Sequence, residues 1–236
     1  SRRLHKQGLA TGLGDEGGYA PAIARPVEAL DLIVAAIEDA GYTPGRHGIA
    51  IALDPAANSF YADGTYTVAG RAYTPEQMIT YYDRLITDYP IWSLEDPLAE
   101  EDTEGWPALT AALGNRVQVV GDDLFVTSAV RVRDGIRTAS ATAVLIKPNQ
   151  AGTVSETFDT LTAASEGGFG AMVSHRSGET DDTFVADLAV GSGCGQLKSG
   201  APARGERVAK YNRLLEIADE HPDLPYGPTG THLKDQ

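Results

Sequence analysis

Short apolar segments alternate with helical segments along most of the chain. Apolar runs that read as buried strands end near residues 54, 95, 122, 147, 175 and 198. Between them lie stretches with helical periodicity, such as the one over residues 25–41. Apolar runs, rather than alternating apolar and polar residues, are typical of strands in a parallel sheet that is covered on both faces. The sequence therefore predicts an α/β fold of repeated strand and helix units.

Local signals place further elements. Asp63 and Gly64 indicate a hairpin turn within residues 60–68. Thr74, followed by Pro75 and by Gln77, has the pattern of a helix N-cap with a capping box. No low-complexity linker divides the 236 residues, and an α/β barrel of about this size is common. We therefore expect a single domain of the (β/α) barrel type.

The composition excludes some classes of function. The chain has 19 basic and 33 acidic residues, and its net charge of -14 argues against binding to nucleic acid, as no basic stripe is present. The single cysteine, Cys194, has no partner for an internal disulfide bond. No apolar run reaches membrane-spanning length, so we expect a soluble, cytoplasmic protein with no membrane partner.

Polar residues stand where the predicted strands end. A charged residue or a histidine occupies six strand ends and the loop before the first of them: Glu16, Asp54, Glu95, Asp122, Lys147, His175 and Lys198. Each separation exceeds the roughly dozen residues that a crossover between parallel strands needs. In a (β/α) barrel, the carboxyl ends of the strands meet at the catalytic face. We therefore expect these side chains to share one site.

Three of these residues have the chemistry of a magnesium site. Asp54, Glu95 and Asp122 end consecutive strands and would supply hard carboxylate oxygens. Mg²⁺ prefers such ligands and keeps its other positions for water and substrate. The absence of His and Cys from these positions makes zinc a poorer choice. The predicted cofactor is Mg²⁺.

The remaining residues suggest proton transfer. Lys147 and Lys198 would face the carboxylates, and a lysine near a second cation and a metal loses part of its preference for the charged form. Glu16 would approach from the opposite side. Two titratable groups on either side of a metal-bound substrate indicate proton removal at one carbon and protonation of a leaving group at the next. Arg176 and Ser177, beside His175, add donors suited to a phosphate.

Each feature also has an ordinary explanation when it is taken alone. Asp122 with Asp123 is typical of a loop turn or a helix N-cap, and the lysines could extend to the surface. His175 could be a structural histidine, and the glycines around Glu16 could form a simple turn. The joint pattern at successive strand ends favours a site.

Several long motifs match a known family in their order along the chain. They are GDEGGYAP, SLEDPLAEED, VGDDLFVT, LIKPNQAGT, VSHRSGET and KSGAPARGERVAKYN. On these motifs, which run from about residue 9 to about residue 216, the chain resembles enolase, the phosphopyruvate hydratase of glycolysis. The resemblance implies a lyase that dehydrates 2-phosphoglycerate to phosphoenolpyruvate.

The resemblance also implies a role for each site residue. Asp54, Glu95 and Asp122 fall where the family binds Mg²⁺. Lys147 falls at the base that removes the C2 proton, and Glu16 at the acid that helps the C3 hydroxyl to leave. His175, Arg176 and Ser177 fall where the family holds the substrate phosphate, and Lys198 falls where it contacts the substrate carboxylate. Enolase-superfamily sites pair a Lys or His base with one or two Mg²⁺ ions.

The resemblance carries expectations about the whole molecule. Enolases have an N-terminal domain and the first barrel strands before the GDEGG segment, so we expect this chain to form an incomplete barrel. We expect residues 1–220 to be the C-terminal catalytic domain and residues 221–236 to be a tail. We expect such a fragment to be weakly stable and essentially inactive alone. The full-length form is expected to be a cytoplasmic homodimer or octamer, with a secreted or surface-associated pool.

Departures from the family pattern keep two alternatives open. Pro148, Ala151, Asn58 and Ala203 stand where enolases usually have other residues. The first three motivate an enolase paralogue that acts on a related phosphonate, as carboxyphosphonoenolpyruvate synthase does. The other alternative is a non-catalytic binding role. Because Pro148 follows the expected base, its fixed φ and missing N–H could reposition Lys147.

Overall fold

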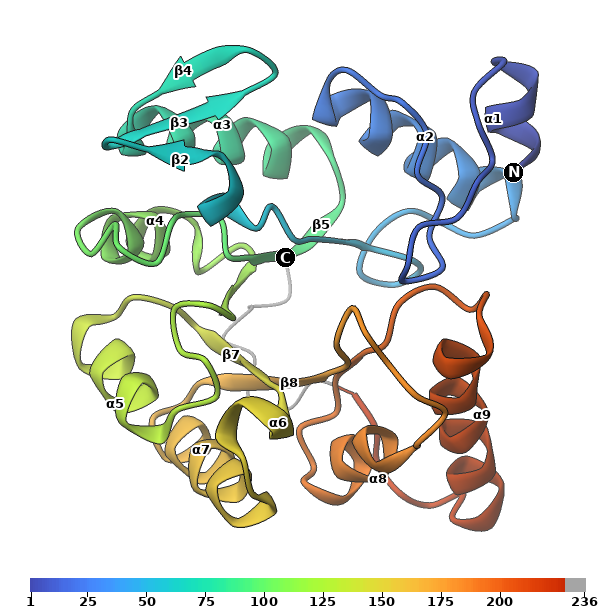
Figure 1. The fold of residues 1–236 in the computed structure, drawn as a ribbon, viewed down its shortest axis with the longest axis vertical. Helices are drawn as coiled ribbons and strands as arrows, with labels where there is room; N and C mark the ends of the chain where they lie inside the picture. Colours follow the sequence, from blue (N-terminus) through green and yellow to red (C-terminus); the bar gives the residue numbers. More distant parts are fainter. Residues whose placement is uncertain (228–236) are drawn as a thin grey trace. The chain divides into compact units, whose positions relative to one another are not determined.

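The computed structural model describes residues 1–227 of the chain (Figure 1). Its helices are α1 (Arg2–Lys6), α2 (Pro26–Asp39), α3 (Pro75–Asp88), α4 (Gly105–Leu113), α5 (Ala129–Thr138), α6 (Pro148–Ala151), α7 (Val154–Glu166), α8 (Phe184–Gly191), α9 (Gly205–Glu220) and the 3-10 helix η1 (Ala57–Phe60). Its strands are β1 (Ile51–Leu53), β2 (Tyr61–Ala62), β3 (Thr65–Val68), β4 (Arg71–Tyr73), β5 (Ile91–Glu95), β6 (Gln118–Gly121), β7 (Ala143–Ile146), β8 (Gly170–Ser174) and β9 (Leu197–Lys198). The predicted alternation of strands and helices is confirmed.

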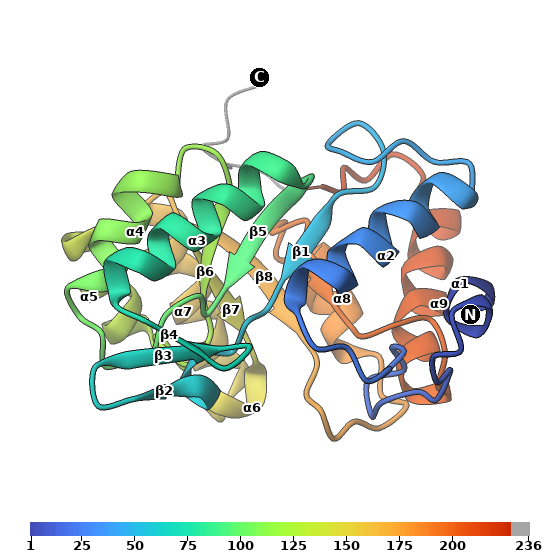
Figure 2. The same cartoon turned by 90° about the horizontal axis from the view of Figure 1, so that it is seen from above.

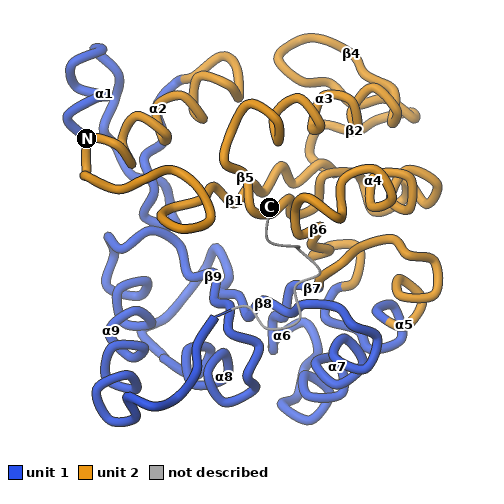
Figure 3. The backbone as a smooth tube through the Cα atoms, turned by 180° about the vertical axis from the view of Figure 1, so that it is seen from behind, with its two compact units in different colours: residues 1–22, 126–132, 144–231 blue, residues 23–125, 133–143, 232–236 orange. Residues whose placement is uncertain are grey.

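The chain forms two compact units, coloured separately in Figure 3. Unit 1 contains Ser1–Ala22, Val126–Val132 and the described residues from Val144 onward, and unit 2 contains Ile23–Phe125 and Arg133–Ala143. The division into a domain over 1–220 and a tail over 221–236 stays a prediction. Residues 228–236 of that tail lie outside the described residues.

Unit 2 is organised around three parallel strands. β1 pairs with β5, and β5 pairs with β6, so that Leu53 lies opposite Leu94 and Glu95 opposite Val120. Figure 2 shows β1 and β5 side by side. Every residue of β6 is buried, as the apolar run predicts. β1 is less buried than expected, with Ala52 exposed, because its one partner strand within the described part of unit 2 is β5.

A three-stranded antiparallel sheet also belongs to unit 2. β2 and β3 form the predicted hairpin, with Asp63 at φ 50° and Gly64 at φ 76° in its turn. Two successive residues with positive φ suit the twist of a tight hairpin, and Asp-Gly tolerates them well. β4 adds to the other side of β3. The sequence does not predict this third strand, which is only three residues long.

Helix α3 begins as the sequence predicts. The Thr74 hydroxyl accepts a hydrogen bond from the N–H of Gln77, and the Gln77 side chain accepts one from the N–H of Thr74. Pro75 occupies the first turn, where its missing N–H costs nothing. The buried side chains Met78, Tyr82 and Leu85 then lie at helical spacing on one face.

Unit 1 holds the later strands and helices. All four residues of β7 are buried, and all but its first belong to this unit. β8 pairs in parallel with β9, so that Ser174 lies opposite Lys198. Helices α7 and α8 pack against β8, and α8 also packs against α9, as Figure 1 shows.

Candidate functional site

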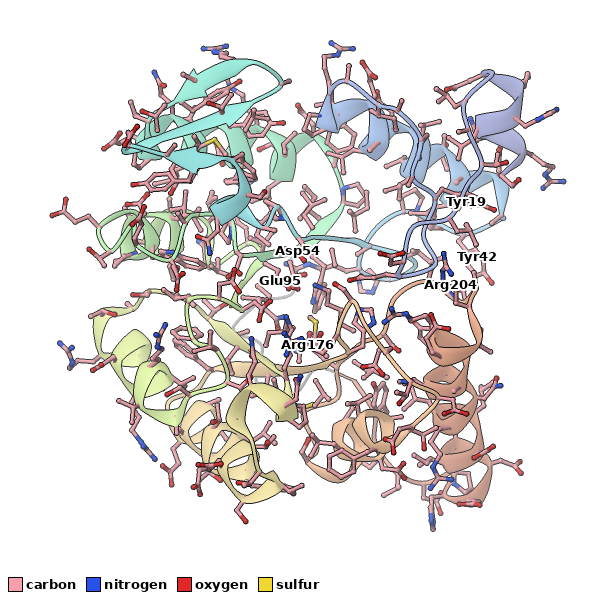
Figure 4. All side chains as sticks on the ribbon, viewed as in Figure 1. Tyr19, Tyr42, Asp54, Glu95, Arg176 and Arg204 are labelled. Carbon is pink, nitrogen blue, oxygen red and sulfur yellow. The ribbon has the colours of Figure 1, made fainter. Side chains whose placement is uncertain are left out.

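The three acidic residues expected to bind metal all lie in unit 2, at the carboxyl ends of its parallel strands. Asp54 follows β1, Glu95 is the last residue of β5, and Asp122 follows β6. Figure 4 labels Asp54, directly after β1, and Glu95, at the end of the paired strand β5. Glu95 and Asp122 are buried, whereas Asp54 is exposed and its Oδ1 accepts a hydrogen bond from the N–H of Ala56.

The compact acidic group of the structure differs from the expected set. Carboxylate oxygens of Asp96, Asp122 and Asp123 lie within 4.8 Å of one another. Only Asp122 is shared with the expected ligands. The two additional members are Asp96, which follows Glu95, and Asp123, which follows Asp122. The sequence signal that could have found them is a pair of adjacent acidic residues at each of two neighbouring strand ends.

Asp96 organises this group. Its Oδ1 accepts the N–H of Asp122 at 2.8 Å, and its Oδ2 accepts the N–H of Asp123 at 2.9 Å. Burial raises the pKa of Asp96 to about 7; the two N–H donors oppose this change, and the neighbouring carboxylates add to it. Asp96 has φ 42°, a left-handed conformation that is unusual for a residue other than glycine. This turn of the backbone directs the Asp96 carboxylate to the two N–H groups that follow β6.

Asn58 explains part of the local geometry. Its amide donates to Oδ2 of Asp123 at 2.9 Å, and its carbonyl accepts the N–H of Glu100, also at 2.9 Å. A carboxylate at this place could not donate to Asp123. Asn58 therefore supplies a neutral donor beside the acidic group.

The acidic group fits a hard divalent cation. All its ligand atoms are carboxylate oxygens, and two of its three residues, Asp96 and Asp122, are buried. Carboxylates gathered in a partly buried place repel one another, and a cation relieves that repulsion. The structure therefore supports a metal site at this end of β5 and β6.

A separate apolar cavity of about 530 Å³ also lies in unit 2, lined by side chains of α2, β3 and α3. Ile33, Met78 and Leu85 contribute to its wall, and Asp54 is one of its few charged lining residues. Apolar walls of this kind do not suit a phosphorylated substrate. The cavity is therefore distinct in chemistry from the acidic group.

The expected base, Lys147, lies in unit 1 directly after β7. It is half-buried, and its N–H donates to the Thr127 hydroxyl at 2.9 Å. The same hydroxyl donates to Oε1 of Gln150 at 2.8 Å. Pro148 is the first residue of the short helix α6, where a proline is well tolerated, and Lys147 has the extended φ of -121° that a residue before proline prefers. The proline therefore leaves the backbone of Lys147 in an ordinary conformation.

Glu16 and the segment after β8 meet within unit 1. Ser177 donates through its hydroxyl to Oε1 of Glu16 at 3.1 Å. Nε2 of His175 lies 3.4 Å from Oε2 of Glu16. Arg176 donates to the side chain of Asn149 at 2.8 Å. The carbonyl of Lys198 accepts the N–H of His175. The contacts thus bring together four of the expected residues, Glu16, His175, Ser177 and Lys198.

Two buried cations on α9, Arg207 and Lys210, are further functional candidates that the strand-end pattern of the sequence does not include. Arg207 and Lys210 are 1% and 0% exposed, respectively, and both contact the segment that follows β8. The signal that could have found them is a pair of charges three residues apart in a helix, in line with buried apolar positions such as Ile217.

Comparison with known proteins places the chain in a family. Residues 2–226 match the family model described as the enolase C-terminal TIM barrel domain. The chain belongs to this enolase family. It is 58% identical over 220 residues to the enolase of Acidothermus cellulolyticus, an alignment that covers 93% of this chain and 51% of that protein. It is 55% identical over 217 residues to the enolase of Beutenbergia cavernae, covering 92% of this chain and 51% of that protein.

Membership of the enolase family confirms the predicted α/β barrel class, in agreement with the parallel strands found within each unit. The chain spans about half the length of the curated enolases that it matches. Within residues 1–227, no helix is both long enough and apolar enough to cross a lipid bilayer.

Proposed function

We propose that this chain supplies the catalytic barrel of an enolase, which dehydrates 2-phosphoglycerate to phosphoenolpyruvate. The observation that carries the proposal is the family match over residues 2–226. The acidic group after β5 and β6 supports it, because the reaction needs positive charge next to a substrate carboxylate.

In the proposed reaction, the proton on C2 is weakly acidic because its removal adds charge to an anionic carboxylate. Lys147, in its neutral form, takes this proton, and the electron pair of the C–H bond forms the new double bond. Glu16 gives a proton to the C3 hydroxyl, which leaves as water. The half-buried position of Lys147 and its anchored backbone N–H support this role, because a general base must be held in place.

The remaining residues would bind the substrate. We assign the phosphate to His175, Arg176 and Ser177, and the carboxylate to Lys198. Asp54, Glu95 and Asp122 would hold Mg²⁺, with Asp96 and Asp123 adjacent to them. When bound, Mg²⁺ supplies the positive charge that makes the extra negative charge on the substrate tolerable.

The test uses the full-length protein and measures, by the absorbance of the product, the Mg²⁺-dependent formation of phosphoenolpyruvate from 2-phosphoglycerate. We expect Lys147→Ala to lower kcat by roughly 10²–10⁴-fold, the usual contribution of a general base. Lys6→Ala, which removes an exposed lysine of α1, is the matched control and should leave kcat unchanged. A folded, Mg²⁺-loaded protein that does not turn over 2-phosphoglycerate would contradict the proposal.

Two other outcomes correspond to the alternatives. Turnover of a phosphonate analogue without turnover of 2-phosphoglycerate would favour a paralogue, an idea motivated by Pro148, Ala151 and Asn58. Binding of a macromolecule that survives Lys147→Ala would favour a non-catalytic role. The name of both relatives, enolase, favours the first proposal over either alternative.

From family membership we also propose that the full-length protein is cytoplasmic and forms a homodimer or an octamer. Light scattering on the purified full-length protein measures the oligomeric state. A monomer at micromolar concentration would contradict this part of the proposal.

A further inference from the structure

Helix α9 carries a completely buried guanidinium, that of Arg207, which is 1% exposed. An arginine remains charged in proteins, and a buried charge is tolerated only when it is well paired or hydrogen-bonded. The partners of Arg207 therefore indicate what this charge does in the fold.

Most of these partners lie in the segment after β8. Nη1 of Arg207 donates to the carbonyl of Arg176 at 2.6 Å, and Nη2 donates to the carbonyls of Ser177 at 2.6 Å and Asp15 at 3.2 Å. Glu206 lies 3.5 Å from Nε of Arg207. The planar fork thus joins the segment after β8 to the loop that carries Glu16.

The remaining contact is to a ring nitrogen. Nη1 of Arg207 lies 2.5 Å from Nδ1 of His175. A guanidinium can only donate, so Nδ1 of His175 must accept, and the proton of the neutral ring must then be on Nε2. Nε2 in turn lies 3.4 Å from Oε2 of Glu16, a hydrogen-bond acceptor.

We propose that Arg207 is a positioning residue, which occupies Nδ1 of His175 and so keeps the Nε2 proton of the ring directed at the carboxylate of Glu16. The tautomer can be observed without any turnover, whereas its contribution to catalysis rests on the proposed function of Glu16 as the acid. Nε2 of His175 then faces Oε2 of Glu16, and the Ser177 hydroxyl donates to Oε1.

The charged groups around the ring favour the neutral form. Burial lowers the pKa of His175 to about 4; Glu16 opposes this change, Arg207 and Lys198 add to it, and Glu179 opposes it more weakly. A neutral ring is required for a fixed tautomer, because both nitrogens of the imidazolium carry protons. At pH 7, without substrate, the ring can therefore accept from Arg207 at Nδ1 while its Nε2–H faces Glu16, and this same Nε2–H is the donor available to a substrate phosphate.

Gly200 leaves room for both side chains. This glycine has φ 74°, and a Cβ at its position would come within 3.1 Å of Cε1 of His175 and 3.2 Å of Cδ of Arg207. A larger residue at this position would therefore crowd the contact between His175 and Arg207.

A second buried cation secures the far end of the same segment. Nζ of Lys210 donates to Oε2 of Glu179 at 2.9 Å, and the Glu179 carboxylate also accepts the N–H groups of Arg176 and Thr180. This second anchor does not contact His175. Substitution of Arg207 should therefore disturb the ring of His175 while the segment stays attached at Glu179.

The test is a long-range ¹H–¹⁵N correlation spectrum of the histidine rings at pH 7, in the absence of substrate, with His175→Gln used to assign the signals. We expect Nδ1 of His175 to show the shift of an unprotonated nitrogen and Nε2 that of a protonated one. The Nδ1–H tautomer in the unaltered protein would overturn the proposal without any variant.

Variants then isolate the role of Arg207. Arg207→Met removes every donor, and we expect a mixture of tautomers and a higher pKa for His175. Arg207→Lys keeps a donor and should restore much of the Nε2–H form. Arg213→Met is the matched control, since Arg213 lies on the same helix and pairs with Asp187 of α8. An unchanged His175 spectrum in a folded Arg207→Met would also overturn the proposal.

The spectrum separates this inference from the proposed function. A protein with the expected tautomer but no turnover of 2-phosphoglycerate would keep the inference and contradict the reaction. Turnover with the opposite tautomer would contradict the inference alone. If Arg207→Met does not fold, the unaltered protein and Arg207→Lys still decide the matter, since a Nδ1–H tautomer in either contradicts the proposal.

Discussion

The carboxylate of Asp96 accepts the backbone N–H of Asp122 at 2.8 Å. Its other oxygen accepts the N–H of Asp123, so a single side chain fixes the turn that follows β6. Groups that orient metal ligands commonly matter for metal affinity nearly as much as the ligands do. We therefore expect Asp96 to matter to metal binding at the acidic group about as much as Asp122, the member that the sequence singles out.

Replacing Asp96 by asparagine should weaken the proposed Mg²⁺ site. The amide keeps one acceptor but turns an NH₂ group towards a backbone N–H, and two donors repel each other. We expect Mg²⁺ affinity to fall roughly 10–100-fold, measured by isothermal titration calorimetry. Asp134→Asn, which alters an exposed carboxylate paired with Arg137, should leave the affinity unchanged. Equal affinities in all three proteins would show that Asp96 does not orient the ligands.

Pro148→Ala should have a small effect. Because Pro148 is the first residue of α6, alanine fits the same backbone, and the main loss is the stiffness that proline gives to the unfolded chain. We expect the free energy of unfolding to fall by about 0.4–1 kcal/mol in urea denaturation, with kcat unchanged. A large loss of kcat at nearly normal stability would mean that Pro148 does position Lys147.

Thr74→Ala removes the capping box of α3 and should lower the free energy of unfolding by about 1 kcal/mol. Thr80→Ala is the matched control on the same helix. The Thr80 hydroxyl donates to the carbonyl of Glu76, a bond that competes with helix geometry, so its removal should be neutral or slightly stabilising. Equal losses in the two variants would argue against a special role of the cap.

Stability should depend on pH through His175. Burial lowers its folded pKa to about 4, whereas the unfolded chain titrates near 6.5. The unfolded state therefore binds the extra proton first, so the contribution of His175 is complete above pH 6.5 and is lost as pH falls to about 4. A pKa lowered by this amount corresponds to roughly 3 kcal/mol.

Denaturation between pH 4 and 7 checks this prediction by comparing the unaltered protein with His175→Gln, since other carboxyl groups titrate in both. The difference between the two should shrink as pH falls. His5→Gln, which changes an exposed histidine of α1, should follow the unaltered protein at every pH. A difference that does not vary with pH would mean that His175 keeps an ordinary pKa.

Much of the architecture is local and was readable in the sequence. The capping box of Thr74, the turn at Asp63 and Gly64, and the apolar runs of β6 and β7 each depend on residues a few positions apart, whose preferences act within one element. The polar residue after each strand was also readable, because burial of the run makes a charge at its end conspicuous. Family membership followed from the same motifs.

The contacts between these elements needed the tertiary structure. Asp96 reaches Asp122 across 26 residues, Asn58 reaches Asp123 across 65, and Ser177 reaches Glu16 across 161. By itself the sequence determined the order of strands and helices, the enolase family and the residue types at the strand ends. Only the tertiary structure decided which carboxylates gather after β5 and β6, and which nitrogen of His175 faces Arg207. The physical reason is that a hydrogen bond depends on atomic positions within a few tenths of an ångström, which the packing of distant segments sets.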